Sequence, residues 1–162
     1  LKNINPLLNA DVLYALRAMG HGDDLVIADT NFPSDSVARE TKLGKLLRID
    51  NTTAAEAVRA ILSVMPLDSF VDHAAHRMEV VGAAGDIPKV QQEVDFSLEH
   101  HPCFQVKFQW HKIVMRYANG RVRRSDQIAE NASLLFLLDQ GFNKTATFCR
   151  WAAILVKPTS FF

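Results

Sequence analysis

Apolar side chains recur at helical spacing in three segments of the first hundred residues, and these segments predict helices over 10–19, 53–65 and 87–98. The stripes consist of Val12, Leu13, Leu16 and Met19, then Val58, Ile61, Leu62 and Met65, and finally Val90, Val94 and Leu98. Asn9 or Asp11 can cap the first helix, and Gly20 can close it. Thr53-Ala54-Ala55-Glu56 has the spacing of a capping box, and Pro66 ends the second helix.

Short apolar runs between these stripes predict strands. Leu25–Ala28 is continuous and indicates a parallel strand buried on both faces, and Lys45–Ile49 and Met78–Val81 are further strand candidates. The polar segment 31–36 predicts a loop. Leu134–Leu138 is strongly apolar, and Ile154–Val156 is a candidate terminal strand. Alternating strands and helices predict an α/β fold, and 162 residues suit one domain spanning 1–162.

Composition is that of a globular protein, with 48% hydrophobic and 22% charged residues. Cys103 and Cys149 are the only cysteines, too few for a disulfide framework, which favours a reducing compartment. No apolar run approaches the ~20 residues of a membrane span, and the chain does not open with a basic, then apolar, leader pattern. We therefore expect a cytoplasmic protein with no membrane partner.

The zero net charge conceals an asymmetry between the two parts of the chain. Residues 1–100 carry 9 basic and 15 acidic side chains (balance −6), whereas residues 101–162 carry 9 and 3 (balance +6). The basic segment 107–124 interleaves Phe108, Trp110 and Tyr117 with its cations. This pattern suits single-stranded nucleic acid, and it equally suits a solvated segment.

The most informative chemistry lies in Met19-Gly20-His21-Gly22-Asp23 and in Asp29, which follows the predicted strand 25–28. An imidazole titrates near neutral pH, and flanking glycines leave room for a ligand, so His21 is a candidate acid–base group. Asp29 can bind a ligand hydroxyl at the edge of a sheet. Both residues also suit an ordinary turn, and spacing alone leaves these alternatives open.

Other site patterns are weaker. His73-Ala74-Ala75-His76 would place two imidazoles on one face of a helix, as metal ligands are placed, but no third ligand has supporting spacing. His100 and His101 fit a solvated helix end. The sequence contains no glycine-rich phosphate loop and no nucleophile motif, so we expect neither a metal nor a cofactor.

Several separate motifs resemble the L-fucose mutarotase / D-ribose pyranase family. Besides the segment 19–23, they are Leu1-Lys2-x-Ile4-x-Pro6-Leu7-Leu8, Asp29-x-Asn31-Phe32-Pro33, Pro66-Leu67-Asp68-Ser69-Phe70 and Met78-Glu79-Val80-Val81. They occur in the family's order and cover about the first hundred residues.

The resemblance implies an α/β domain with a mostly parallel central sheet flanked by helices. It also implies interconversion of sugar anomers without cofactor or metal, a monosaccharide partner of the fucose type, and assembly into a ring-type homo-oligomer. It carries His21 over as the catalytic acid–base and Asp29 as a substrate-binding carboxylate. Ring opening moves one proton from the anomeric hydroxyl and one to the ring oxygen, which a near-neutral group can do.

The spacing of His21 and Asp29 raises a geometric difficulty. They lie at opposite ends of the strand 25–28, and four extended residues span ~13 Å. One sugar cannot readily touch both in a single copy of the chain. We therefore expect a neighbouring subunit to complete the site.

Residues beyond about 100 depart from the family pattern. The family's second half carries a helix with Phe-x-Phe-Tyr, a strand ending in Thr-Gly-Glu and a closing Lys-Gly, and none is present in register. With suitable synonymous codons, shifting the codons of 118–127 forward by one base can produce A-A-F-A-V-Q-T, close to the family's penultimate strand. The same shift over 133–142 can produce L-Y-C-F-F-L-T-K-G, close to its closing segment. A shifted reading frame would also explain the change in charge balance, so no binding residue is carried over from this half.

The leading interpretation is an isomerase that interconverts anomers of L-fucose or a related monosaccharide. The first alternative is a non-catalytic sugar-binding relative, because an altered second half would remove part of the site. The second alternative is a nucleic-acid-binding protein that uses the segment 107–124. The sequence selects neither the sugar nor the oligomer number.

Overall fold

The computed structural model describes residues 1–20, 22–30, 32, 34–68, 74–78, 83 and 85–99, together with the later strands. The helices are α1 (Ala10–Ala18), α2 (Ser34–Arg39), α3 (Ala54–Leu62) and α4 (Lys89–Glu99). The strands are β1 (Asp24–Asp29), β2 (Leu47–Asp50), β3 (Ala75–Met78), β4 (Lys112–Ile113), β5 (Arg116–Ala118), β6 (Arg121–Arg123), β7 (Ala132–Asp139) and β8 (Ile154–Val156). Helices and strands are thus mixed, which confirms the α/β class.

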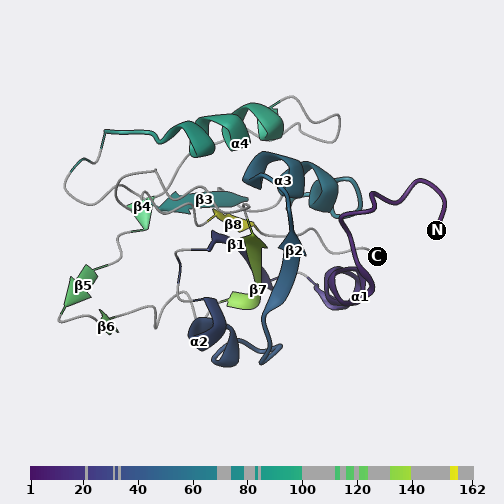
Figure 1. Ribbon diagram of the computed structural model, residues 1–162, viewed down its shortest axis with the longest axis horizontal. Helices are drawn as coiled ribbons and strands as arrows, with labels where there is room; N and C mark the ends of the chain where they lie inside the picture. Colours follow the sequence, from purple (N-terminus) through teal and green to yellow (C-terminus); the bar gives the residue numbers. More distant parts are fainter. Residues whose placement is uncertain are drawn as a thin grey trace.

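The larger sheet of the described strands has the order β2-β7-β1-β8-β3-β4. β1 runs parallel to β7 and antiparallel to β8, and β2 also runs parallel to β7. In Figure 1, α3 and α4 lie on one side of this sheet, α2 lies on the other side, and α1 stands beside β2. The carboxyl ends of β1, β2 and β7 therefore point toward the same edge.

β1 lies between β7 and β8, and its residues from Asp24 to Ala28 are all buried. This confirms the predicted strand 25–28, extended by one residue at each end. Leu25 and Ile27 join the core cluster formed with α1 and α3. Because side chains alternate along a strand, Val26 and Ala28 face the α2 side.

The beginning of α1 confirms the sequence prediction, but its end does not. Asn9 caps the helix by accepting a hydrogen bond from the Val12 N–H at 3.0 Å, and its amide donates to the Arg48 carbonyl of β2 at 3.0 Å. The helix ends at Met19, whose backbone is extended (φ −66°, ψ 144°), so the prediction that Gly20 closes the helix is wrong. The chain needs an extended exit here because it turns immediately into β1.

α3 confirms the predicted capping box and buried stripe. Thr53 Oγ1 accepts from the Glu56 N–H at 3.2 Å, and Glu56 Oε2 accepts from the Thr53 N–H at 3.0 Å. All four stripe residues are buried in the core: Val58, Ile61, Leu62 and Met65. The helix ends at Ser63, before Pro66.

Two local predictions are wrong. Residues Ser34–Ser36, predicted as loop, form the first half of α2, because Val37 and Ala38 bury its inner face beside β7. The third strand begins at Ala75, three residues before its predicted start, and 79–81 lie outside the described residues. Ala75 and His76 have weak strand propensity, so this strand is formed through its pairing with β8.

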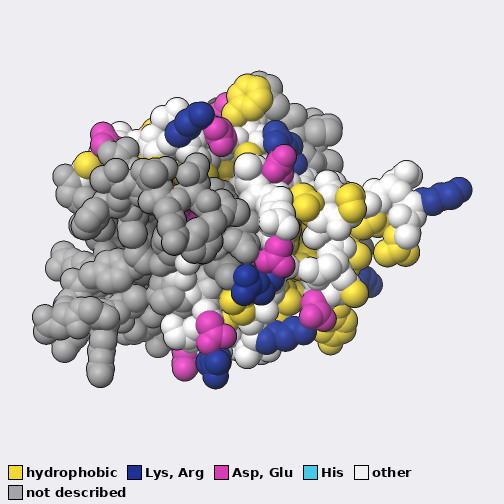
Figure 2. All heavy atoms as spheres, viewed as in Figure 1, with side chains coloured by type: hydrophobic (Ala, Val, Ile, Leu, Met, Phe, Trp, Pro, Cys, Tyr) yellow, Lys and Arg dark blue, Asp and Glu magenta, His cyan; other side chains and the backbone are white. Residues whose placement is uncertain are grey.

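On the face shown in Figure 2, charged groups of both signs are interspersed among the described residues. Exposed ion pairs include Arg39–Asp35 at 2.8 Å and Lys45–Asp11 at 3.2 Å. These exposed pairs contribute little to stability individually. Within the part of the chain that the structure describes, no helix has the length and apolar character needed to cross a membrane.

Candidate functional site

A tight turn that runs from Gly20 to Asp23 precedes β1. The Asp23 N–H donates to the Gly20 carbonyl at 3.1 Å, and the Gly20 N–H donates to Asp23 Oδ2 at 2.8 Å. Gly22 has φ +88°, a conformation that side-chain-bearing residues rarely adopt. His21 itself lies outside the described residues. The flanking glycines are thus part of a hydrogen-bonded turn, which is the alternative that spacing alone left open.

Asp23 also anchors this turn to the loop after α2. Its Oδ1 accepts from Lys42 Nζ at 3.3 Å, while its Oδ2 accepts from Gly20. The carboxylate therefore holds the turn from two directions. This explains why an acid follows Gly22 without requiring it to contact a ligand.

Asp29 is the last residue of β1 and is partly buried. Its carbonyl accepts from the Phe32 N–H at 3.2 Å, and the Phe32 carbonyl accepts from the Ser34 N–H at 2.7 Å, so the chain turns directly into α2. Strand alternation places Asp29 on the face of Leu25 and Ile27, the face covered by α3. The predicted sugar-binding carboxylate therefore lies at the carboxyl edge of the parallel strands.

The structure does not bring the two ends of β1 together. The turn around His21 lies at the amino end of β1, and Asp29 lies at its carboxyl end. Six extended residues separate the ends by about 17 Å. β1 is two residues longer than predicted, so this separation exceeds the ~13 Å expected from four residues.

Asp68 is a further candidate that the sequence analysis did not assign to a role. It is only 1% exposed, and its neighbours Met65 and Leu67 are buried with it. Burying a carboxylate is costly unless polar groups surround it, so a buried acid in this position needs a specific environment. The signal in the sequence is the acid inside the apolar segment Pro66-Leu67-Asp68-Ser69-Phe70.

The structure does not support the hypothesis that His73 and His76 bind a metal from one face of a helix. His76 lies in β3 and not in a helix, so the helical spacing on which the metal hypothesis depended does not apply to it. His73, His100 and His101 lie outside the described residues. Among the described residues, no three His, Cys, Asp or Glu side chains cluster as metal ligands do. The aromatic and basic side chains of 107–124 also lie outside what the structure describes.

Two carboxyl groups have shifted pKa values. Burial raises the pKa of Asp95 on α4 to about 6, with Arg77 opposing the rise and Glu99 adding to it. The hydrogen bond from the Thr53 backbone lowers the pKa of Glu56, assisted by the Thr53 and Thr52 hydroxyls. Neither group lies at the ends of β1, so neither replaces His21 as the candidate acid–base group.

The chain is similar to known proteins in sequence and in structure. A profile of the RbsD / FucU transport protein family matches residues 2–120. Fucose mutarotase of Bos taurus is 41% identical over 81 residues, which are 50% of this chain and 52% of the bovine protein. The chain spans about half the length of the curated relatives that it matches.

Solved structures resemble the chain over nearly its whole length. Protein Atu2016, described as a candidate sugar-binding protein, has a TM-score of 0.79 and 42% identity, covering 99% of this chain and 96% of its own. A fucose mutarotase from Streptococcus pneumoniae, solved in complex with L-fucose, has a TM-score of 0.71 and 29% identity, with full coverage of both chains.

Proposed function

Because this chain belongs to the RbsD / FucU family, as its match over residues 2–120 shows, we propose that it is a monosaccharide mutarotase. The family resemblance found in the sequence is thereby confirmed, and the match extends beyond the first hundred residues. The proposed reaction interconverts the anomers of L-fucose or a related sugar. It makes the chain an isomerase.

The proposed chemistry needs one proton carrier and one group that holds the sugar. The anomeric hydroxyl loses its proton while the ring oxygen gains one, the ring C–O bond breaks, and the open-chain aldehyde forms. Rotation about the bond to the aldehyde carbon, followed by closure, gives the other anomer. A group with a pKa near neutrality can remove and return the protons, so His21 is the proposed acid–base group.

Asp29 is the proposed sugar-binding carboxylate. A carboxylate accepts hydrogen bonds from two neighbouring sugar hydroxyls, and it stands at the edge where open α/β sheets bind ligands. The observation that carries the proposal is the match of the motifs around His21 and Asp29 to a family whose relatives include fucose mutarotases.

Saturation-transfer NMR on equilibrated L-fucose tests the proposal directly. We expect the protein to accelerate exchange between the two anomeric proton signals, and His21→Ala to lower the rate by ~10²–10⁴-fold toward the spontaneous reaction. Arg17→Ala, at an exposed position on α1, is the matched control and should retain exchange. Exchange that survives in His21→Ala would refute the role of His21. Running D-ribose in parallel determines the preferred sugar.

A non-catalytic sugar-binding relative is the second candidate, because residues beyond about 100 depart from the family's motifs and could remove part of the site. It predicts sugar-dependent shifts of protein NMR signals without any acceleration of anomer exchange. The same samples therefore distinguish the two functions.

A further inference from the structure

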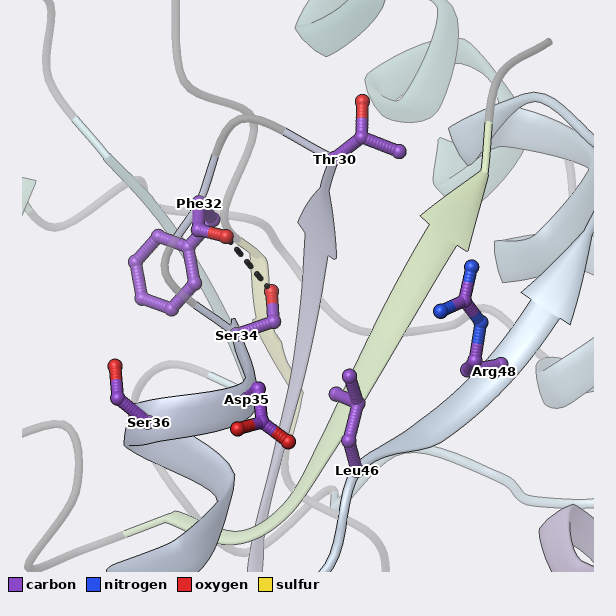
Figure 3. Close-up of a pocket in the computed structure, with 7 residues that line it drawn as sticks. All are labelled: Thr30, Phe32, Ser34, Asp35, Ser36, Leu46 and Arg48. Atoms are coloured by element: carbon purple, nitrogen blue, oxygen red, sulfur yellow. Dashed lines mark hydrogen bonds between the residues drawn. The ribbon is translucent and has the colours of Figure 1, made fainter.

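A groove of about 500 Å³ lies on the α2 side of the sheet, and its lining begins at Thr30, directly after Asp29. Its lining consists of residues that follow β1, belong to or precede α2, and belong to or precede β2: Thr30, Phe32, Ser34, Asp35, Ser36, Leu46 and Arg48. Figure 3 shows Ser34 and Asp35 on α2 facing the strands across the groove from Leu46 and Arg48. Its volume falls in the range of small-molecule sites.

The alternation of β2 shows which face carries the groove. Leu47 and Ile49 are buried in the core cluster with α1 and α3, so Arg48 between them points to the opposite face. Asp29 shares the face of Leu25 and Ile27 instead, and it is absent from the described lining of the groove. The Asp29 side chain and the groove therefore lie on opposite faces of the sheet, although Thr30 of the lining directly follows Asp29.

The charges around the groove balance. Arg48 Nε lies 3.3 Å from Asp50 Oδ1, and Asp35 Oδ2 accepts from Arg39 Nη2 at 2.8 Å. Two guanidinium groups and two carboxylates leave no net charge to attract an anion. The lining includes the hydroxyls of Thr30, Ser34 and Ser36 and the apolar side chain of Leu46. Ser34 Oγ already donates to the Phe32 carbonyl at 3.3 Å, so toward a ligand it can serve only as an acceptor.

That combination matches a neutral polyol. Each sugar hydroxyl can donate to a carboxylate or serine oxygen and accept from a guanidinium or hydroxyl, while the C–H faces of the ring pack on apolar carbon. We infer that this groove is a second binding site for a neutral monosaccharide, separate from the site that contains Asp29. The choice of L-fucose or a related sugar as its ligand rests on the proposed function, because the proposed substrate is the monosaccharide that the protein would meet.

Backbone amide NMR shifts measured during an L-fucose titration test the inference. We expect saturable shifts at Ser34, Ser36 and Leu46, and at least a tenfold weaker affinity at these signals in Arg48→Met. Methionine retains the apolar stem of the side chain and removes only the guanidinium. Thr30→Val, which keeps the shape of Thr30 but removes its hydroxyl, provides a second variant if Arg48→Met does not fold. Arg17→Ala should bind as the unmodified protein does.

Inorganic phosphate at the same ionic strength is the contrasting probe. If these amide signals shift with phosphate but not with L-fucose, the inference is overturned. It is also overturned if L-fucose shifts them in the unmodified protein and in Arg48→Met but not in Asp29→Asn. Groove binding that persists in His21→Ala while anomer exchange is lost would support two separate sites. If the unmodified protein binds L-fucose in the groove but does not accelerate anomer exchange, the mutarotase proposal is overturned and the second-site inference stands.

Discussion

Asp95 is the described carboxyl group whose environment penalises ionisation most clearly. It lies half-buried on α4, near Arg77 of β3, whose Nη1 donates to Gln91 Oε1 at 2.9 Å. Within the described residues, Asp95 Oδ1 is buried and has no hydrogen-bond partner. Desolvation outweighs the attraction of Arg77, so the pKa of Asp95 rises to about 6.

Asp95→Asn should therefore stabilise the protein above pH 6. The folded state holds the Asp95 proton up to about pH 6, whereas the unfolded chain releases it near pH 3.8, so stability falls as pH rises between these values. Asparagine removes this ionisation penalty, and we expect a gain of about 1–2 kcal/mol at pH 8 after screening by solvent.

Urea unfolding at pH 8 and below pH 4 measures the difference. The gain should vanish below pH 4, where both side chains are neutral. Glu40→Gln, at an exposed position, is the control and should show no comparable gain. An equal effect of Asp95→Asn at both pH values would contradict the desolvation argument.

At the scale of elements, α3 illustrates how local and tertiary interactions reinforce each other. Its capping box pairs Thr53 with Glu56, and its apolar face packs into the core with β1 and β2. The cap satisfies backbone N–H groups that the first helical turn leaves unpaired. The start of α3 is thus determined by four consecutive residues.

Thr53→Ala should lower the free energy of unfolding by about 1 kcal/mol, because the helix loses the side-chain acceptor for the Glu56 N–H. Thr53→Ser keeps that acceptor and should remain near the stability of the unmodified protein. Denaturant midpoints of both variants provide the comparison, and equal losses would show that the methyl group of Thr53, not the cap, matters.

At the scale of the whole molecule, the separation of Asp29 from the turn around His21 has a testable consequence. We expect His21 of one copy and Asp29 of another to form each complete site. Neither His21→Ala nor Asp29→Asn alone should then accelerate anomer exchange. Co-assembled in equal amounts, the two variants should recover about a quarter of the native sites, each combining the two intact residues.

Saturation-transfer NMR on the co-assembled variants, with each variant alone as control, measures this recovery. No recovery in verified mixed assemblies would contradict a shared site. Full activity of a verified monomer would contradict it as well.

The reading frame of the second half is a second prediction at this scale. If residues beyond about 100 are encoded out of frame, peptides from this part of the protein produced from its natural gene should differ in mass from those of the sequence 101–162. Peptide mass spectrometry measures this. Peptide masses that match residues 101–162 would contradict a sequence error.

Local patterns predicted the elements that depend on neighbouring residues. The Asn9 cap, the Thr53–Glu56 box, α4 and the buried run of β1 are confirmed because their interactions link residues within about one helical turn or one strand. The predictions failed at Ser34–Ser36 and at Ala75–Arg77, where packing on β7 and pairing with β8 outweighed local propensity. Tertiary contacts can thus outweigh the local conformational preference of a short polar segment.

The sequence by itself determined the family, the α/β class and the candidacy of His21 and Asp29, because motifs and periodicity are properties of consecutive residues. Only the tertiary structure decided that β7 lies between β1 and β2, that Asp68 is buried, and that Arg48 faces Ser34 across a groove. These relations join residues far apart in the chain. Their formation depends on how sheet faces and helices bury apolar surface together, which no local pattern records.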